Sequence, residues 1–293
     1  MSLLLGVLEQ GFIYAILSLG VYITFKILDF PDMSVDSTYP LGAAVTALMI
    51  SNGINPLLTL PAALLAGAAA GVITGVIHVR LHVSNLLSGI IVMTGLYSIN
   101  LHITGNRANV SFFNNVTLFK NSRVSALPAW IQPYAPVIIL FLAALCCKLL
   151  MDWYLSTRSG FLLRATGDNE TLVTTLAKDS GMVKILGLSI ANALVALAGC
   201  IMCQFQRYFD ISMGTGTLVL AVASVIVGTQ LLRGLRFLKS TTAVIIGAIL
   251  YRACVALALS AGLSPFDLKL VTAALLLVII VGGGYRKKVK RHA

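Results

Sequence analysis

The sequence predicts an all-α integral membrane protein, a polytopic bundle of about eight or nine transmembrane helices that forms one domain over residues 1–293. Of the 293 residues, 58% are hydrophobic and only 11% are charged, whereas a soluble domain carries about 25% charged residues. The mean hydropathy is +0.94. The apolar residues are also gathered in runs, and a helix needs about 20 such residues to cross a bilayer.

Nine apolar runs are the candidate spans, and polar or charged residues separate them. They cover approximately 3–27, 38–51, 57–79, 85–104, 134–155, 183–206, 215–232, 240–260 and 267–284. The run 38–51 is the shortest and contains Pro40 near its start. We therefore expect a broken or half-depth helix there, which a membrane tolerates only where the freed backbone groups are buried or line a cavity.

A basic tail at 285–293 follows the last apolar run and indicates the cytoplasmic side of the membrane. Basic residues beside spans favour that side and contact anionic lipid. Tracing the spans back from this tail places the polar segment 159–184 inside. The same tracing places an acidic connector inside, which holds Asp29, Asp32 and Asp36.

The long loop 105–133 is expected on the external side, together with the turn at Asp210 and the N-terminus. The loop combines Phe, Trp, Asn and Arg residues. This combination suits a docking surface for an external partner, and it equally suits an aromatic belt at the membrane interface.

The segment 159–184 is a polar island between long apolar runs. We expect a short helix in it, with Asp168 or Asn169 as N-cap and with Ser180–Gly181 as its end. Its candidate contact residues are the polar Arg164, Asp168, Asn169 and Glu170, and the apolar Leu172, Val173 and Leu176, which share one helical face. Such a helix is either a contact for a soluble partner or an interfacial helix lying on lipid headgroups.

The sequence lacks the motifs of common enzyme classes. GxxxxGK[ST], HExxH and GxSxG are all absent. Cys200 and Cys203 form a CxxC pair in an apolar context, where packing is a better interpretation than metal or redox chemistry. The basic residues are not interleaved with aromatic residues on a soluble face, as nucleic-acid binding requires. We therefore predict that the chain is no enzyme, has no catalytic or metal site and does not bind nucleic acid.

Polar side chains within spans are candidates for a path through the membrane, because polar groups in lipid are costly unless they face a cavity or a partner. Selected by polarity and helical phase, these path candidates are Tyr39, Asn85, Tyr97, Asn100, Asn192 and Gln204. The asparagines can instead join helices by hydrogen bonds. Arg252, near the middle of a span, either extends to the outer interface or pairs with a carboxylate. Gly67, Gly71 and Gly75 form overlapping GxxxG units, which predict close helix packing.

Two segments carry a resemblance to a known family. Leu28–Ile50 reads LDFPDMSVDSTYPLGAAVTALMI, where Asp32–Val35 fills an Asp-Leu-Ser-Val-like motif and Asp36 replaces a usual glycine. Gly160–Met182 reads GFLLRATGDNETLVTTLAKDSGM and resembles a cytoplasmic coupling segment. The chain thus resembles the permease subunits of bacterial ABC importers of the ribose and branched-chain amino acid type. The stretch GVYITFKILDFPDMSVD is most similar to a branch linked to tryptophan, other aromatic amino acids or unassigned substrates.

The resemblance implies a transport subunit in the bacterial inner membrane, with its C-terminus in the cytoplasm. Two copies of this chain would form the path for a small solute, an amino acid or a related compound, which an external binding protein delivers. ATP and Mg²⁺ would bind to a separate ATPase subunit, so this chain would carry no cofactor. The polar island would be the coupling helix, with its apolar residues in a groove of the ATPase and its charged residues at the rim.

Two other classes of function compete with this interpretation. The first is a stand-alone secondary carrier or channel for a small polar solute, in which the island only lies on the membrane. Proton-coupled carriers usually bury a carboxylate in mid-span, and the predicted spans show acidic residues only near their ends. The second is a membrane enzyme or a scaffold, which the missing catalytic motifs and the polar stripes disfavour.

Overall fold

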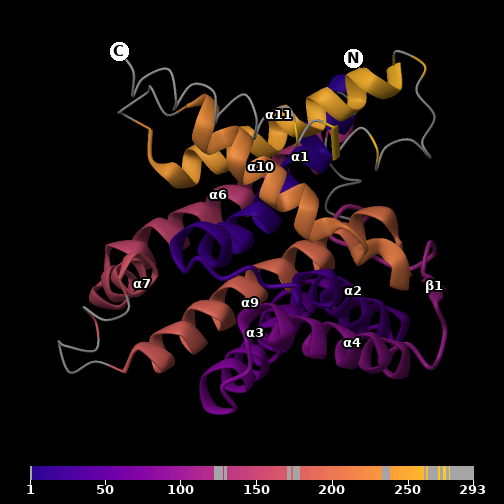
Figure 1. Ribbon diagram of the computed structural model, residues 1–293. Helices are drawn as coiled ribbons and strands as arrows, with labels where there is room; N and C mark the ends of the chain where they lie inside the picture. The colour runs from indigo at the N-terminus through magenta and orange to yellow at the C-terminus, as the bar shows by residue number, and fades with distance from the viewer. Residues whose placement is uncertain are drawn as a thin grey trace.

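The chain is a helical bundle in a computed structural model that describes residues 2–121, 128, 131–169, 173, 179–232 and 238–260, with the single residues 262, 270, 273, 274 and 277 (Figure 1). The predicted span 267–284 lies almost wholly outside the described residues, and the basic tail lies entirely outside them. The described helices match the predicted all-α membrane fold.

The predicted runs from 3–27 to 240–260 each coincide with a helix to within a few residues. The α-helices are α1 (Ser2–Tyr22), α2 (Val35–Ser51), α3 (Pro56–Arg80), α4 (Asn85–Ile103), α6 (Ala135–Ser156), α7 (Arg158–Asp168), α9 (Ser180–Gln206), α10 (Thr217–Leu231) and α11 (Ser240–Ser260). The short elements are the π-helix η1 (Ile23–Ile27), the 3-10 helices η2 (Gln132–Tyr134) and η3 (Ile211–Gly214), and the strands β1 (Asn109–Ser111) and β2 (Tyr208–Asp210). Among the described residues, 7 helical segments have the length and hydropathy to cross a membrane.

Helix α9 lies at the centre of the bundle, in contact with α1, α2 and α3 (Figure 1). Its closest neighbour is α3, which packs against it through the predicted small-residue face. A Cβ atom at Gly67 or Gly71 would overlap backbone carbonyl oxygens of α9, and one at Gly75 would lie 2.8 Å from the Cα of Ile185. The prediction of close packing through the GxxxG units is therefore confirmed. Cys200 and Cys203 are free thiols fully buried in α9, as packing requires.

Helix α2 is short, with 17 residues, and it begins deep in the bundle. The connector before it contacts α9 at Asn192, 12 residues after the start of α9 and so about 18 Å along that helix. The connector is therefore not an acidic loop at the cytoplasmic surface, as the sequence suggested. Asp29 is exposed, but Asp32 is fully buried and Asp36 contacts the start of α10.

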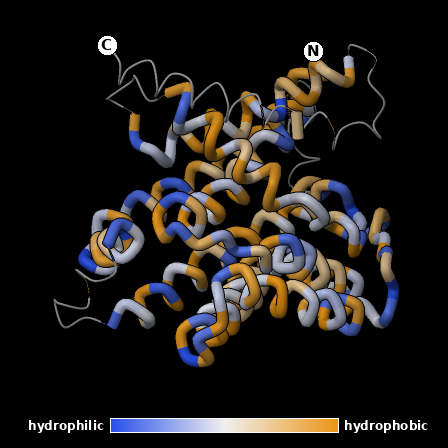
Figure 2. Tube along the Cα trace, in the orientation of Figure 1, coloured by the Kyte–Doolittle hydropathy of each residue, from blue (hydrophilic) through white to orange (hydrophobic). Residues whose placement is uncertain are grey.

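The loop 105–133 and the turn after α9 meet in a two-stranded antiparallel ribbon, in which Asn109 pairs with Asp210 and Ser111 pairs with Tyr208. Phe112 and Phe209 are buried beneath it against the C-terminal half of α2. The ribbon and α7 lie at opposite ends of the molecule (Figure 1), and hydrophilic residues are frequent at both (Figure 2). Since α9 begins beside the polar island and ends at β2, it connects the two ends.

Candidate functional site

Helix α7 is seated on the ends of three other helical segments. The Thr157 side chain caps its first turn by accepting a hydrogen bond of 3.3 Å from the Gly160 N–H. Gly167 lies against η1 so closely that a Cβ atom there would overlap the carbonyl oxygen of Ile27. Leu163 is fully buried and contacts α9 beside Gly187. A displacement of α7 therefore acts directly on the end of α1 and on α9.

The opposite face of α7 is open to solvent. Phe161 is 72% exposed on this face. Arg164, Asp168 and Asn169 are also exposed on this part of the chain. The helix thus presents an aromatic side chain with charged neighbours on the side that faces away from the bundle.

The expected ends of the island helix are corrected in part. Asp168 is the last residue of α7 and so does not begin a helix, whereas Asn169 follows in an extended conformation that an N-cap also adopts. Residues 170–172 and 174–178 lie outside the described residues, so Asn169 as N-cap stays a prediction. At the other end, Asp179 caps α9 by accepting hydrogen bonds from the Gly181 and Met182 N–H groups at 2.9 and 3.2 Å. Ser180 and Gly181 therefore open the next helix.

Of the remaining predicted coupling residues, Val173 is fully buried within the chain, so its side chain is not on the surface in this structure. Glu170, Leu172 and Leu176 lie outside the described residues. The outward face that the structure does describe at this end is that of α7.

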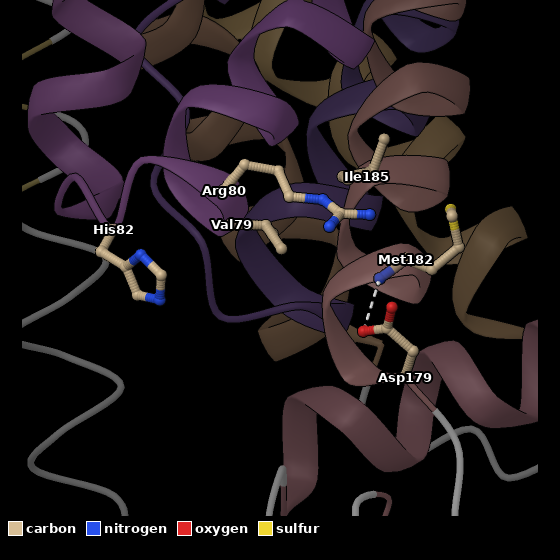
Figure 3. A pocket seen from close by; sticks show the side chains of 6 residues that line it. All are labelled: Val79, Arg80, His82, Asp179, Met182 and Ile185. Carbon is tan, nitrogen blue, oxygen red and sulfur yellow. Dashed lines mark hydrogen bonds between the residues drawn. The ribbon is translucent and has the colours of Figure 1, made fainter.

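A cavity of about 280 Å³ lies beside the start of α9, at the same end of the molecule as α7. Figure 3 shows Arg80 and His82, from the end of α3 and its connector, on one side and Asp179 on the other. A guanidinium, an imidazole and a carboxylate thus line the junction between α3 and α9, next to the polar island.

The path candidate Asn192 instead joins helices. It is fully buried, and its Nδ2 donates to the Asp32 carboxylate at 2.8 Å and to the Leu188 carbonyl at 3.1 Å. Its Oδ1 accepts from the Ser34 hydroxyl at 3.3 Å. The buried carboxylate of Asp32 also accepts from the Ser34 N–H at 2.9 Å. These bonds hold the start of α2 against the middle of α9.

Two more path candidates are fully buried and make interhelical bonds. Asn100 donates from Nδ2 to the Ser37 carbonyl at 3.0 Å and so joins α4 to α2. Gln204 donates to the Thr59 hydroxyl at 2.8 Å and accepts from the Leu118 N–H at 3.1 Å. These contacts agree with the alternative interpretation, in which polar residues within spans link helices by hydrogen bonds.

Asn85 is half-buried at the start of α4, and Tyr97 is 50% exposed on that helix. The face of α4 that packs on the bundle runs instead through Ser88, Val92 and Leu96. Tyr97 therefore points away from the packed face of the helix.

Asp36 makes a contact that the sequence analysis missed. Helix α10 has Gly216 as N-cap, which has no side chain to satisfy the first N–H groups. The Asp36 carboxylate supplies that cap from α2, accepting from the Gly216 N–H at 3.0 Å, the Leu218 N–H at 2.8 Å and the Thr217 hydroxyl at 3.1 Å. The available signal was an aspartate where the family resemblance leads one to expect glycine.

A second cavity, of about 250 Å³, lies beneath the β1–β2 ribbon. Tyr14, Tyr39 and Tyr208 line it together with Asp210, and α1, α2 and β2 supply these residues. The guanidinium of Arg252 lies 5.4 Å from the centroid of the Tyr14 ring, and among the described residues it forms no ion pair with a carboxylate. Of these residues, Tyr39 alone was a predicted site residue, since only the folded chain brings Tyr14 and Tyr208 together.

Comparisons with known proteins agree with this architecture. The family model for the permease component of branched-chain amino acid transport systems matches residues 3–281. The chain is 44% identical over 273 residues to the tyrosine transport system permease protein of Clostridioides difficile strain R20291, covering 93% of this chain and 88% of the relative. It is 34% identical over 275 residues to the uncharacterized protein RP368 of Rickettsia prowazekii strain Madrid E, covering 92% and 94%.

A more distant relative is the ribose import permease protein RbsC of Escherichia coli strain K12. The two are 30% identical over 239 residues, which covers 79% of this chain and 70% of the relative. No solved structure matches the chain. Two of these three relatives are named as transport permease proteins.

Proposed function

Because this chain belongs to the family of permease components of branched-chain amino acid transport systems, a multi-pass membrane component of an ABC-type system for amino acids or sugars, we propose that it is the transmembrane subunit of an ATP-driven importer for an aromatic amino acid. The observation that carries this proposal is the similarity to a permease named for tyrosine transport, at 44% identity over 93% of the chain. The cavity lined by three tyrosines supports it, since aromatic rings stack favourably on one another.

ATP hydrolysis belongs to a separate subunit, because this sequence has no P-loop. That subunit binds ATP and Mg²⁺ and docks against the exposed face of α7 and the polar island that follows. The burial of Leu163 and the close contact of Gly167 with η1 support this assignment, because α7 is coupled mechanically to α1 and α9. The exposed Phe161 supplies an apolar anchor, and Arg164 and Asp168 supply charges around it. Leu172 and Leu176 follow α7 in the sequence, and we propose that they contact the ATPase subunit as well.

The orientation follows from the basic tail. With residues 285–293 in the cytoplasm, α7 lies at the cytoplasmic end and the β1–β2 ribbon at the external end of the inner membrane. An external binding protein delivers the solute at the ribbon. Two permease chains enclose the path, and pairing of this chain with a second copy of itself is our proposal for their arrangement. The exposed Tyr97 face of α4 is available for that contact.

The proposal is tested by uptake of radiolabelled L-tyrosine into cells that lack the chain and into the same cells complemented with it. We expect uptake only in complemented cells. It should persist when the proton gradient is collapsed and disappear when the P-loop lysine of the partner ATPase is replaced. Uptake that follows the ion gradient and ignores the ATPase would instead establish a secondary carrier.

A further inference from the structure

The cavity beneath the β1–β2 ribbon has the composition of a site for an aromatic ring. Besides its three tyrosines, it is lined by Met202 and Met213, whose sulfur atoms pack favourably against aromatic rings. Its volume of about 250 Å³ lies just below the range of about 300–1,000 Å³ typical of small-molecule sites. The cavity is thus suited to a ligand of the size of one amino acid.

Tyr39 gives this cavity a hydrogen-bonding group that the protein leaves unused. The Tyr39 side chain is 1% exposed, and its hydroxyl has no hydrogen-bond partner within the described part of the chain. Buried hydroxyls are nearly always paired, because an unsatisfied one costs about 1–3 kcal/mol. An unpaired buried hydroxyl in the wall of a cavity indicates that a ligand supplies the partner.

The half-buried Asp210, which also lines the cavity, carries a negative charge. The Asp210 carboxylate accepts from the Ser212 N–H at 2.7 Å and from the Asn109 Nδ2 at 3.3 Å. Partial burial raises the pKa of this carboxyl, but the hydrogen bonds from Ser212 and Asn109 outweigh burial and lower the pKa below its usual value. The carboxylate is therefore ionised at neutral pH, and with about four acceptor positions it retains capacity for a cationic ligand group.

We propose that this cavity is a transient binding site for an aromatic amino acid in the translocation path, and that it holds the aromatic ring among Tyr14, Tyr39 and Tyr208. The ammonium group of the ligand binds the Asp210 carboxylate at the half-buried side. A phenolic hydroxyl on the ligand reaches the hydroxyl of Tyr39 on the buried side. The guanidinium of Arg252, stacked on Tyr14, brings positive charge next to the cavity wall and so favours a zwitterion over a cation. This inference rests on the proposed function.

The test compares uptake of L-tyrosine with uptake of L-phenylalanine in cells complemented with the wild-type chain or with Tyr39→Phe. The substitution removes only the hydroxyl. One neutral hydrogen bond corresponds to a factor of about two to ten, so we expect the tyrosine-to-phenylalanine ratio of uptake efficiency to fall by about two- to tenfold. The external binding protein is the same in both strains, so any change in the ratio arises in the permease. Tyr22→Phe, a buried tyrosine away from the cavity, is the matched control and should keep the ratio.

A second variant tests the other half of the site. Asp210→Asn should lower uptake of both amino acids by about tenfold, because a charge-assisted bond to the ammonium group is lost. The exposed Asp29→Asn is its control. An unchanged ratio in Tyr39→Phe, an equal loss of both amino acids in that variant, or full uptake in Asp210→Asn would each overturn the inference. Absence of aromatic uptake in the wild type would instead overturn the proposed function with it.

Discussion

Replacing Asp36 should loosen the junction between α2 and α10, and the structure allows the size of the effect to be worked out. The Asp36 carboxylate accepts three hydrogen bonds at the start of α10, between 2.8 and 3.1 Å. The loss of a helix N-cap costs about 1 kcal/mol, and a hydrogen bond to a charged group is worth about 1.5–3 kcal/mol. The three bonds share one carboxylate, so they do not add, and we expect Asp36→Ala to lower the free energy of unfolding by about 2–3 kcal/mol.

The assay is equilibrium unfolding of the purified chain in mixed detergent micelles, followed by the loss of helical circular dichroism. Asp36→Asn keeps one acceptor oxygen and should lose about half as much stability as Asp36→Ala. Asp29→Asn is the control, because Asp29 lies in the same connector with its side chain exposed and asparagine tolerates the positive φ of 51° at this position; surface substitutions of this kind change stability by about 0.5 kcal/mol or less. Equal stabilities of Asp36→Ala and Asp29→Asn would refute the assignment of Asp36 as the cap of α10.

Two further substitutions test the packing that surrounds the site. Gly167→Ala should separate α7 from η1, because its Cβ would overlap the Ile27 carbonyl, and should reduce ATP-dependent uptake severalfold. The control is Gly95→Ala, in α4 with open space around it, which should instead gain up to about 1 kcal/mol of stability. Equal effects of the two substitutions would contradict the close contact of Gly167. Asn192→Ala should lower the free energy of unfolding by about 3 kcal/mol, since it leaves the buried Asp32 carboxylate with fewer donors. The double variant with Asp32→Ala should lose less stability than the sum of the two single losses. Strict additivity in the same unfolding assay would contradict the pairing of these two residues.

The bundle could be predicted because hydropathy alone determines which segments cross a bilayer. The short run 38–51 predicted a broken or half-depth helix, whereas α2 is one continuous helix of 17 residues that contains Pro40; that it does not span the membrane fully stays a prediction. The small-residue face of Gly67, Gly71 and Gly75 predicted close packing, although it did not identify α9 as the partner. That choice depends on the complementary backbone of Leu188 and Asn192, which only the folded chain brings into contact.

The candidate site was less predictable because its residues act across the chain. The island looked like one helix with two caps, yet it contains the end of α7 and the start of α9, so Asp168 ends one helix and Asp179 caps another. Asp36 looked like part of an acidic surface loop, although its partners lie 180 residues and more along the chain. Periodicity within one helix cannot reveal such contacts.

The asparagines of the predicted path illustrate a related limit. Asn100 and Asn192 were selected because polar groups in lipid need a partner, and each has one, but the partner is another helix. Polarity within a span therefore identifies a buried contact without distinguishing a link between helices from a path. The unpaired Tyr39 hydroxyl in the wall of a cavity is the observation on which our proposal for the path rests instead.

The most direct test of the account is affinity purification of this chain from its native host in mild detergent, with identification of the proteins that accompany it. We expect a P-loop ATPase to be recovered with the wild type and lost with Phe161→Asp and with the double substitution Leu172→Asp/Leu176→Asp. Phe113→Asp, which changes an exposed phenylalanine at the opposite, ribbon end, should retain the ATPase. Recovery of the chain alone, still active in uptake, would contradict the assignment of this protein as the permease subunit of an ATP-driven importer.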